Sequence, residues 1–278
     1  MRYIYAPIGC QLIVQQTLSC SCCSITVLTP VSQSASAGFH FLVSGCTNMA
    51  ATETPGAAQK RVLRVLALHG YRQNERSFRE RTGALRKRLR GRADLITFSA
   101  PLLVPDPDAE PGAGVPDSLQ DESRGWWFSN PEQNSFDAME ESNTCSGLEA
   151  SLDTVAKAFS ELGPFDGILG FSQGAALVAI ICALKQQGDP RFHFDFAILV
   201  AGFKSLSTDH TKHYQQPITV PSLHVIGETD RVISAAMSQE LVSHFENPVI
   251  LMHSGGHYVP ACAPQKKVYW EFLDKFLT

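Results

Sequence analysis

The residue of this sequence whose surroundings best suit covalent chemistry is Ser172, at the centre of the segment G-F-S-Q-G (170–174). A short apolar run precedes the segment and a stretch rich in Ala, Leu and Ile follows it, which indicates a strand, a tight turn and a buried helix. On such a turn the serine hydroxyl is exposed above the sheet. The N–H groups that begin the helix suit a developing oxyanion. The segment therefore predicts a nucleophilic serine.

Serine is a poor nucleophile unless a base takes its proton and an acidic group orients that base. Asp230 and His257 follow Ser172 in the order Ser, Asp, His that α/β hydrolases use. Each stands just past the carboxyl end of an expected strand, where ligands bind in parallel sheets. We assign His257 as the general base and acid. Asp230 is assigned as the group that fixes its tautomer and stabilises the imidazolium.

Each of these two assignments has an alternative. Glu228 is the alternative acid, and Asp230 could instead be a helix cap or a turn residue. His253 is the alternative base, but it falls within an expected strand. His257 follows two glycines on a loop, which leaves it free to reach the serine. The order of the three residues favours the set Ser172, Asp230 and His257.

Two backbone N–H groups are predicted to hold the oxyanion. The first belongs to Gln173, the residue after the nucleophile, and the second to Tyr71, in the loop L-H-G-Y-R-Q-N (68–74) after the first strand. His69 is interpreted as a structural residue of that loop. No Gly-Gly-Gly run occurs there, so lipases with that signature match less well.

Two of the three tryptophans stand together in R-G-W-W-F (124–128), inside a Pro-, Gly- and Asp-rich loop from Leu102 to Pro131. Loops of this length in compact domains are usually functional or disordered. The aromatic cluster could fill a gap on the core. It could also line a hydrophobic acyl pocket or form its lid, and Trp126, Trp127 and Phe128 are therefore candidate pocket residues.

Strands and helices alternate from residue 61 onward, which predicts βαβ units and an α/β fold with a mainly parallel, doubly wound sheet covered by helices on both faces. Besides the strand and helix around Ser172, strands are expected at 62–68, 94–98, 194–200, 222–227 and 248–253, and helices at 75–90, 146–162, 234–245 and 265–276.

Residues 1–48 differ in composition from the rest of the chain. Arg2 is their only formally charged side chain, and they are rich in Ser, Thr, Gln and Cys, without helical or strand periodicity. Met49 opens a segment that reads like an ordinary protein start. We expect an N-terminal extension over 1–59, disordered or derived from an upstream start and dispensable, followed by a catalytic domain over 60–278.

Composition excludes several other classes of protein. The 278 residues are 44% hydrophobic and 18% charged with a net charge of −4, which suits one good-sized domain and gives no electrostatic case for nucleic acid. No apolar run is long enough to span a membrane. The cysteines outside residues 1–48 have no paired spacing, which favours a reducing compartment, the cytoplasm or the nucleus. The cluster C-S-C-C (20–23) has no second Cys/His pair at a zinc-like distance, so no metal is expected.

Six blocks along the chain together resemble the FSH-type serine hydrolases of eukaryotes, from about Val62 to the C-terminus. The resemblance implies an α/β-hydrolase fold and hydrolysis of carboxylic esters with a preference for longer, unbranched acyl chains. It also carries a catalytic triad onto Ser172, Asp230 and His257, whereas residues 1–48 depart from the family pattern. The blocks are L-H-G-Y-R-Q-N (68–74), S-A-P (99–101), R-G-W-W-F (124–128), G-P-F-D-G-I-L-G-F-S-Q-G-A-A (163–176), H-V-I-G-E-T-D (224–230) and H-S-G-G-H-Y-V-P (253–260).

The expected function is that of a carboxylesterase-type serine hydrolase without a cofactor, acting on a small-molecule acyl ester through an acyl-enzyme. An acyl-protein thioesterase or lysophospholipase is the main alternative. A binding module that uses the hydrolase pocket without turnover is a second, and a carbon–carbon or dienelactone hydrolase on the same fold a third. The sequence does not indicate an oligomeric state.

Overall fold

The computed structural model divides into two compact units, Met1–Gly56 and Ala57–Thr278. The residues that it describes are 2–3, 13–20, 23–30, 61–105 and 122–277.

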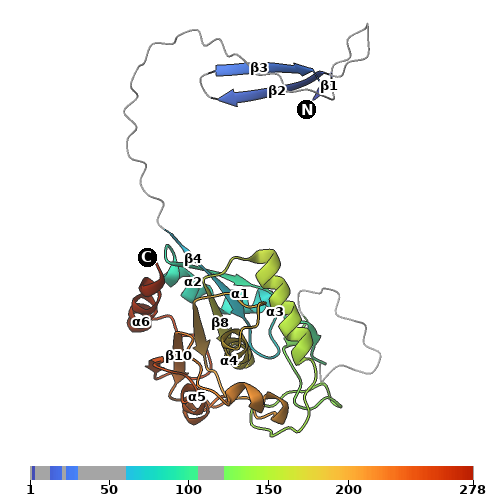
Figure 1. Ribbon diagram of the computed structural model, residues 1–278. Coiled ribbons are helices and arrows are strands. Elements are labelled where there is room, and N and C mark those ends of the chain that lie inside the picture. Colours follow the sequence, from blue (N-terminus) through green and yellow to red (C-terminus); the bar gives the residue numbers. More distant parts are fainter. Residues whose placement is uncertain (1, 4–12, 21–22, 31–60, 106–121, 278) are drawn as a thin grey trace. The chain divides into compact units, whose positions relative to one another are not determined.

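In the first unit the described residues form a three-stranded antiparallel sheet (Figure 1). Its strands are β1 (Arg2–Tyr3), β2 (Ile13–Cys20) and β3 (Cys23–Pro30), and β2 pairs with β3 from Ile13↔Pro30 to Cys20↔Cys23. No strand was expected here, although both long strands contain the β-branched residues that favour extended backbone. The expected upstream start at Met49 lies outside the described residues, as do the side chains of the C-S-C-C cluster.

A six-stranded parallel sheet, in the order β11-β10-β9-β8-β4-β5, organises the described part of the second unit (Figure 1). The chain runs from β4 to the edge strand β5, returns to β8, and then proceeds outward to β11. The order therefore reverses between β4 and β8, and ligands bind at such a point in open α/β sheets. The strands are β4 (Leu63–Leu68), β5 (Ala93–Thr97), β8 (Gly167–Phe171), β9 (Phe196–Val200), β10 (Ser222–Gly227) and β11 (Val249–His253).

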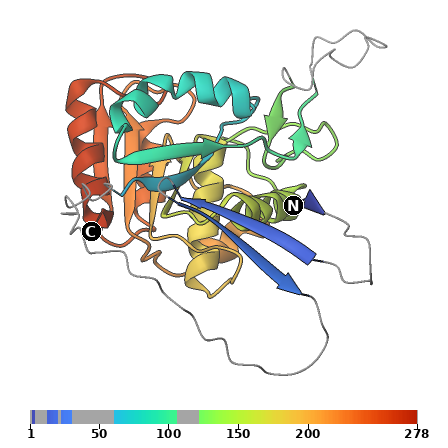
Figure 2. The same ribbon diagram turned by 90° about the horizontal axis from the view of Figure 1, so that it is seen from above.

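Helices cover both faces of this sheet: Figure 2 shows α2 and α6 on one side and α4 on the other. The predicted α/β class and parallel sheet are confirmed. None of the helices in the described residues is long and apolar enough to cross a membrane. The helices are α1 (Glu75–Arg81), α2 (Gly83–Leu89), α3 (Leu148–Leu162), α4 (Gln173–Gln186), α5 (Ala235–Val242) and α6 (Ala263–Leu273), with 3-10 helices η1 (Thr208–Tyr214) and η2 (Asp274–Phe276).

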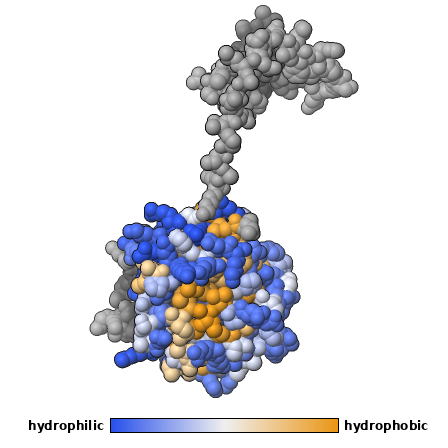
Figure 3. Space-filling model, turned by 90° about the vertical axis from the view of Figure 1, so that its left-hand side faces the viewer, coloured by the Kyte–Doolittle hydropathy of each residue, from blue (hydrophilic) through white to orange (hydrophobic). Residues whose placement is uncertain are grey.

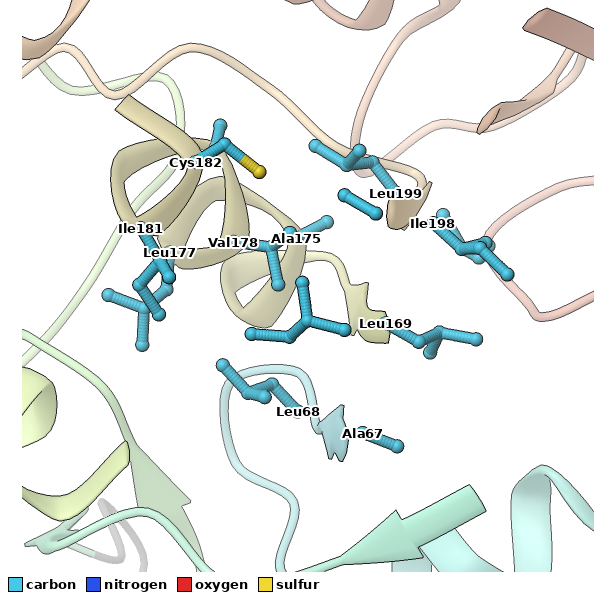
Figure 4. Close-up of a cluster of buried hydrophobic side chains, with 14 of the residues drawn as sticks. Ala67, Leu68, Leu169, Ala175, Leu177, Val178, Ile181, Cys182, Ile198 and Leu199 are labelled. Atoms are coloured by element: carbon cyan, nitrogen blue, oxygen red, sulfur yellow. The ribbon is translucent and has the colours of Figure 1, made fainter. Parts of the chain in front are cut away.

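The central helix α4 is buried from Gln173 to Ala183. Figure 4 shows its apolar side chains against Leu68 of β4, Leu169 of β8 and Leu199 of β9. Because every side of the helix is apolar, its sequence does not alternate between apolar and polar faces. This packing fixes the start of α4, and with it the preceding serine, against the sheet.

The helix predicted at 75–90 is interrupted at Thr82, which separates α1 from α2. The Thr82 hydroxyl donates a hydrogen bond to the carbonyl oxygen of Phe78 at 2.7 Å, and the next residue is a glycine. A back-bonding threonine and a glycine both weaken a helix locally. Three short elements lie outside the expected strands and helices. They are β6 (Leu102–Leu103) and β7 (Arg124–Gly125), which pair with each other, and the 3-10 helix η1.

The outer strand β11 carries two exposed apolar side chains, Ile250 (49% exposed) and Met252 (38% exposed). Figure 3 views the side of the molecule that lies to the left in Figure 1, where α6 and β10 lie, and shows a continuous hydrophobic area on it. The exposed side chains of the edge strand β11 are therefore apolar and uncharged.

Four buried histidines make the stability of the fold depend on pH. Burial lowers the pKa of His69, His210 and His213 from 6.5 to about 4, and that of His224 to about 3. Between pH 6.5 and 4 the unfolded chain therefore binds more protons than the native state. The stabilisation of the native state by neutral histidines is complete above pH 6.5 and is lost as the pH falls toward 4. Denaturant titrations at different pH values measure this loss. We expect each histidine to contribute up to ~1.4 kcal/mol per pH unit to the slope of the free energy of unfolding against pH. His224→Gln should remove the contribution of one histidine to this slope, and an unchanged slope in that variant would contradict the prediction.

Candidate active site

Ser172 lies between the end of β8 and the start of α4, with φ 54° and ψ −119°. A non-glycine residue is strained at a positive φ and needs support from its surroundings. Its N–H donates to the carbonyl oxygen of Val200 on β9 at 2.9 Å, and its own carbonyl accepts from the N–H groups of Ala175 and Ala176. The sheet and the first turn of α4 thus hold the serine in this conformation.

The glycines on either side of Ser172 are required by close packing. A Cβ on Gly170 would collide with the backbone of Gly174 and Ala175, and a Cβ on Gly174 would collide with the carbonyl oxygens of Leu68 and His69. Because all of these atoms belong to the backbone, they cannot turn aside as a side chain could. The glycine pair allows α4 to approach β4 and β8 closely.

Asp230 and His257 lie together in the structure. Nδ1 of His257 is 2.7 Å from Oδ2 of Asp230, and the carboxylate side chain is 1% exposed. The other oxygen, Oδ1, accepts the N–H groups of Val232 at 2.8 Å and Ile233 at 2.9 Å. The carboxylate is thereby fixed as an acceptor on both sides, and it holds the Nδ1–H tautomer of His257. This leaves Nε2 of His257 to accept a proton.

Glu228 and His253, the alternatives to Asp230 and His257, lie in different surroundings from those two residues. The Glu228 side chain is exposed. His253 is buried in β11, and its Nδ1 accepts the N–H of Gly255 at 3.3 Å. In the part of the chain that the structure describes, neither residue is hydrogen-bonded to the imidazole of His257, whereas Asp230 is. The geometry therefore favours Asp230 as the partner of His257.

Tyr71 lines the same cavity as Ser172, and Gln173 follows Ser172 in the chain. Gln173 is the first residue of α4, and N–H groups in that position have no partner within the helix. The Tyr71 N–H makes no hydrogen bond to another group in the described part of the chain. The loop that carries Tyr71 is a tight turn in which the N–H of Gln73 donates to Gly70 O and the Gln73 side chain accepts the Gly70 N–H.

His69 is a structural residue of that loop, as interpreted from the sequence. It is fully buried, its Nδ1–H donates to Gly70 O at 2.7 Å, and its Nε2 accepts the N–H of Ala100 at 2.9 Å. The lowered pKa keeps this imidazole neutral, which the acceptor role of Nε2 requires. His69 therefore joins the loop after β4 to the S-A-P segment after β5.

A cavity of about 420 Å³ contains Ser172 and His257 in its wall. This volume lies in the range of small-molecule sites. Trp126, Trp127 and Phe128 are buried and do not line it; Trp127 instead lies behind Phe136, with ring centroids 5.3 Å apart. The large apolar and aromatic residues of the wall are Tyr71, Phe136, Met139, Phe171, Val232 and Ile233.

Comparison with known proteins places this site in a family. The model of the family described as Serine hydrolase (FSH1) matches residues 59–269, more than half of the chain. The chain belongs to this family. The resemblance inferred from the six sequence blocks is confirmed.

Named relatives of this FSH1 family member are esterases. The chain is 98% identical to Esterase OVCA2 of Xenopus tropicalis over 230 residues, which is 83% of this chain and 100% of the relative. It is 52% identical to human Esterase OVCA2 over 224 residues, 79% of this chain and 99% of the relative.

Among solved structures, acyl-protein thioesterase 2 of Zea mays superimposes with a TM-score of 0.53. The identity is 19%, over 79% of this chain and 95% of that one. At this level of identity the likeness shows the fold alone.

The Gln173 side chain has a role that the sequence did not reveal. It is fully buried, its Oε1 accepts the N–H of Trp126 at 2.9 Å, and its Nε2 donates to the carbonyl oxygen of Trp127 at 2.8 Å. The indole N–H of Trp126 donates to His69 O at 2.7 Å. The tryptophan segment of this FSH1 family member is thus bonded to both loops that form the site. The family motif gave no signal for this role, because the second variable position of G-x-S-x-G accepts many residues.

Gln173→Ala should lower the free energy of unfolding by about 2–4 kcal/mol, because it leaves two buried backbone groups without partners. Thermal unfolding measures the loss. Tryptophan emission of the native variant should shift to longer wavelength as Trp126 and Trp127 gain access to water. Gln239→Ala, on the exposed side of α5, is the matched control and should change neither quantity. Equal stability of the two variants would exclude this role for Gln173.

Proposed function

We propose that this FSH1 family member is a carboxylic-ester hydrolase that works through an acyl-enzyme on Ser172. The observation that carries the proposal is the 2.7 Å contact between His257 Nδ1 and Asp230, with His257 and Ser172 in the wall of one apolar cavity. The strained turn at Ser172 and the FSH1 membership support the same assignment. The esterase names of the relatives agree with it.

In the first half of the reaction, Nε2 of His257 takes the hydroxyl proton as Ser172 Oγ attacks the ester carbonyl. Asp230 stabilises the imidazolium that forms. The N–H groups of Tyr71 and Gln173 hold the oxyanion of the tetrahedral intermediate. They are available for this because neither donates a hydrogen bond to another group among the described residues. The positive end of α4 adds to this stabilisation.

In the second half, the bond from the carbonyl carbon to the leaving oxygen breaks, and His257 gives its proton to that oxygen. A water molecule then attacks the acyl-enzyme while His257 again acts as base. Collapse of the second intermediate releases the carboxylic acid and restores Ser172. This cycle moves protons only between Ser172, His257, water and the leaving group, so the chain's own residues supply every catalytic group it uses.

The walls of the cavity indicate the acyl part of the substrate. Phe136 and Ile233 give it apolar sides, and Met139 (70% exposed) and Val232 (54% exposed) give it an apolar rim. Each methylene group transferred from water to such walls contributes roughly 0.8 kcal/mol when fully buried. We therefore propose a preference for long, unbranched acyl chains.

Rates on p-nitrophenyl esters of increasing acyl length test this function in the full-length protein. We expect kcat/KM to rise with chain length until the cavity is filled and then to level off. Phe136→Ala should flatten the rise, because it opens the apolar wall. If kcat/KM were highest for p-nitrophenyl acetate and fell with every added methylene, the proposed preference for long acyl chains would be rejected.

A thioester and an oxygen ester with the same acyl chain separate this function from that of an acyl-protein thioesterase. The carboxylesterase proposal expects comparable or faster turnover of the oxygen ester. If only the thioester is hydrolysed, the thioesterase takes its place. Absence of turnover on both, with Ser172 unlabelled by a fluorophosphonate, would favour a binding module.

A further inference from the structure

A second, smaller cleft borders the proposed active site. Its volume is about 160 Å³, and it shares Gln73, Phe171 and His257 with the larger cavity. Ser172 lines only the larger cavity. His257 therefore lines both hollows, of which only the larger one also contains the serine.

The order in which bonds break during ester hydrolysis indicates which part of the ester each hollow holds. During collapse of the tetrahedral intermediate the leaving oxygen must lie within reach of the proton on His257, whereas the acyl chain extends away from it. The larger, apolar cavity suits the acyl chain. The smaller cleft, which His257 also lines, is then the place for the leaving group.

The charges of the two hollows differ. In the larger cavity Arg231 is accompanied by Asp137, so the two opposite charges offset each other. In the cleft, Arg81 is the one permanently charged residue of the lining, and no carboxylate accompanies it. Arg81 is an exposed residue in the last turn of α1, and its side chain makes no ion pair or hydrogen bond with any residue that the structure describes. The exposed Tyr258 adds a phenolic residue to the same cleft.

We propose that this cleft binds the leaving group and that Arg81 selects esters whose leaving group carries an anionic oxygen group, a carboxylate or a phosphate. The proposal rests on the proposed function and defines its substrate class. A guanidinium remains charged at every physiological pH and pairs with either anion. The leaving group departs as a neutral hydroxyl with the proton from His257, and its distant anionic group stays paired with Arg81 until release.

One matched pair of substrates measures the selection. Both are long-chain acyl esters of 3-hydroxy-4-nitrobenzoic acid; one has the free carboxylate and the other has the carboxyl group blocked as its methyl ester. We expect the unmodified protein to prefer the carboxylate. Arg81→Gln should lower kcat/KM for the carboxylate about 3- to 10-fold, mainly through KM, and leave the methyl ester within about twofold. Added salt should reduce the preference of the unmodified protein.

Two variants control for charge alone. Arg79→Gln makes the same change in net charge in the same turn of α1, outside both hollows, and should keep the preference. Arg231→Gln tests the other cavity. If Arg231→Gln removes the preference and Arg81→Gln does not, the assignment of the leaving group to the cleft is wrong. An equal preference in the unmodified protein and in Arg81→Gln also overturns the proposal.

The source of the anion is distinguished by a second substrate pair, an acylated glycerol phosphate and the corresponding monoacylglycerol. A larger effect of Arg81→Gln on the phosphate than on the carboxylate identifies phosphate esters as the preferred class.

Binding of 3-hydroxy-4-nitrobenzoate itself, measured by calorimetry, needs no turnover. If no ester is hydrolysed but Arg81→Gln still weakens this binding, the cleft assignment stands and the proposed reaction fails. If binding does not depend on Arg81, the cleft assignment fails.

Discussion

Ser172→Ala is expected to lower kcat for a long-chain p-nitrophenyl ester on the order of 10⁶-fold, because the alanine has no oxygen with which to form the acyl-enzyme. The loss should appear in kcat rather than in KM, since the serine oxygen contributes little to binding before bond formation. The native fold should persist. The backbone bonds that hold this turn come from Val200, Ala175 and Ala176 and do not involve the hydroxyl.

The measurement combines steady-state kinetics with labelling by a fluorophosphonate, which reports the nucleophile independently of substrate. Ser160→Ala, on the exposed side of α3, is the matched control and should retain full rate and labelling. Equal melting temperatures of the two variants would exclude unfolding as the cause. If Ser172→Ala retained a tenth of the activity or more, the acyl-enzyme would have to form on another residue.

Asp230→Asn is expected to lower kcat by about 10⁴-fold while the site keeps its geometry. Oδ1 of Asp230 accepts two backbone N–H groups, from Val232 and Ile233, so an asparagine must place its own oxygen there. Its NH₂ group then faces Nδ1 of His257. The imidazole must accept at Nδ1 and carry its proton on Nε2, the atom that has to receive the proton of Ser172. The substitution thus imposes the wrong tautomer.

Glu228→Gln is the control for this prediction, because Glu228 is the alternative acid and is exposed. It should leave kcat unchanged. The ¹⁵N chemical shifts of the His257 ring provide a direct readout, since they distinguish a protonated from an unprotonated Nδ1. If Asp230→Asn kept Nδ1–H, or if the loss of activity followed Glu228→Gln instead, the proposed role of Asp230 would be excluded.

The strands that carry these residues could be predicted because each is a short apolar run followed by a turn. β10 was expected at its observed bounds, and β11 and β5 within one residue of theirs. The parallel sheet then brings the carboxyl ends of separate strands to one edge, so residues distant in sequence could be expected to meet there. What the spacing cannot fix is the distance between two particular side chains.

The wall of the cavity could not be predicted in the same way. Phe136 lies in a segment without helical or strand periodicity, and its position depends on ring contacts with Tyr71, Trp127 and Phe203. Such contacts join four separate parts of the chain and leave no local pattern. The tryptophans, by contrast, stood out in the sequence, yet they support the wall from behind.

The hydrogen bonds of Gln173 have a consequence for protein engineering. The backbone of this residue belongs to the serine turn and its side chain to the Trp126–Trp127 segment, so the segment cannot be exchanged as an independent module. A graft of the loop from another hydrolase would need a compatible residue at 173. Libraries that reshape the pocket are therefore better directed to Phe136 and Met139, whose side chains line the cavity without anchoring the turn.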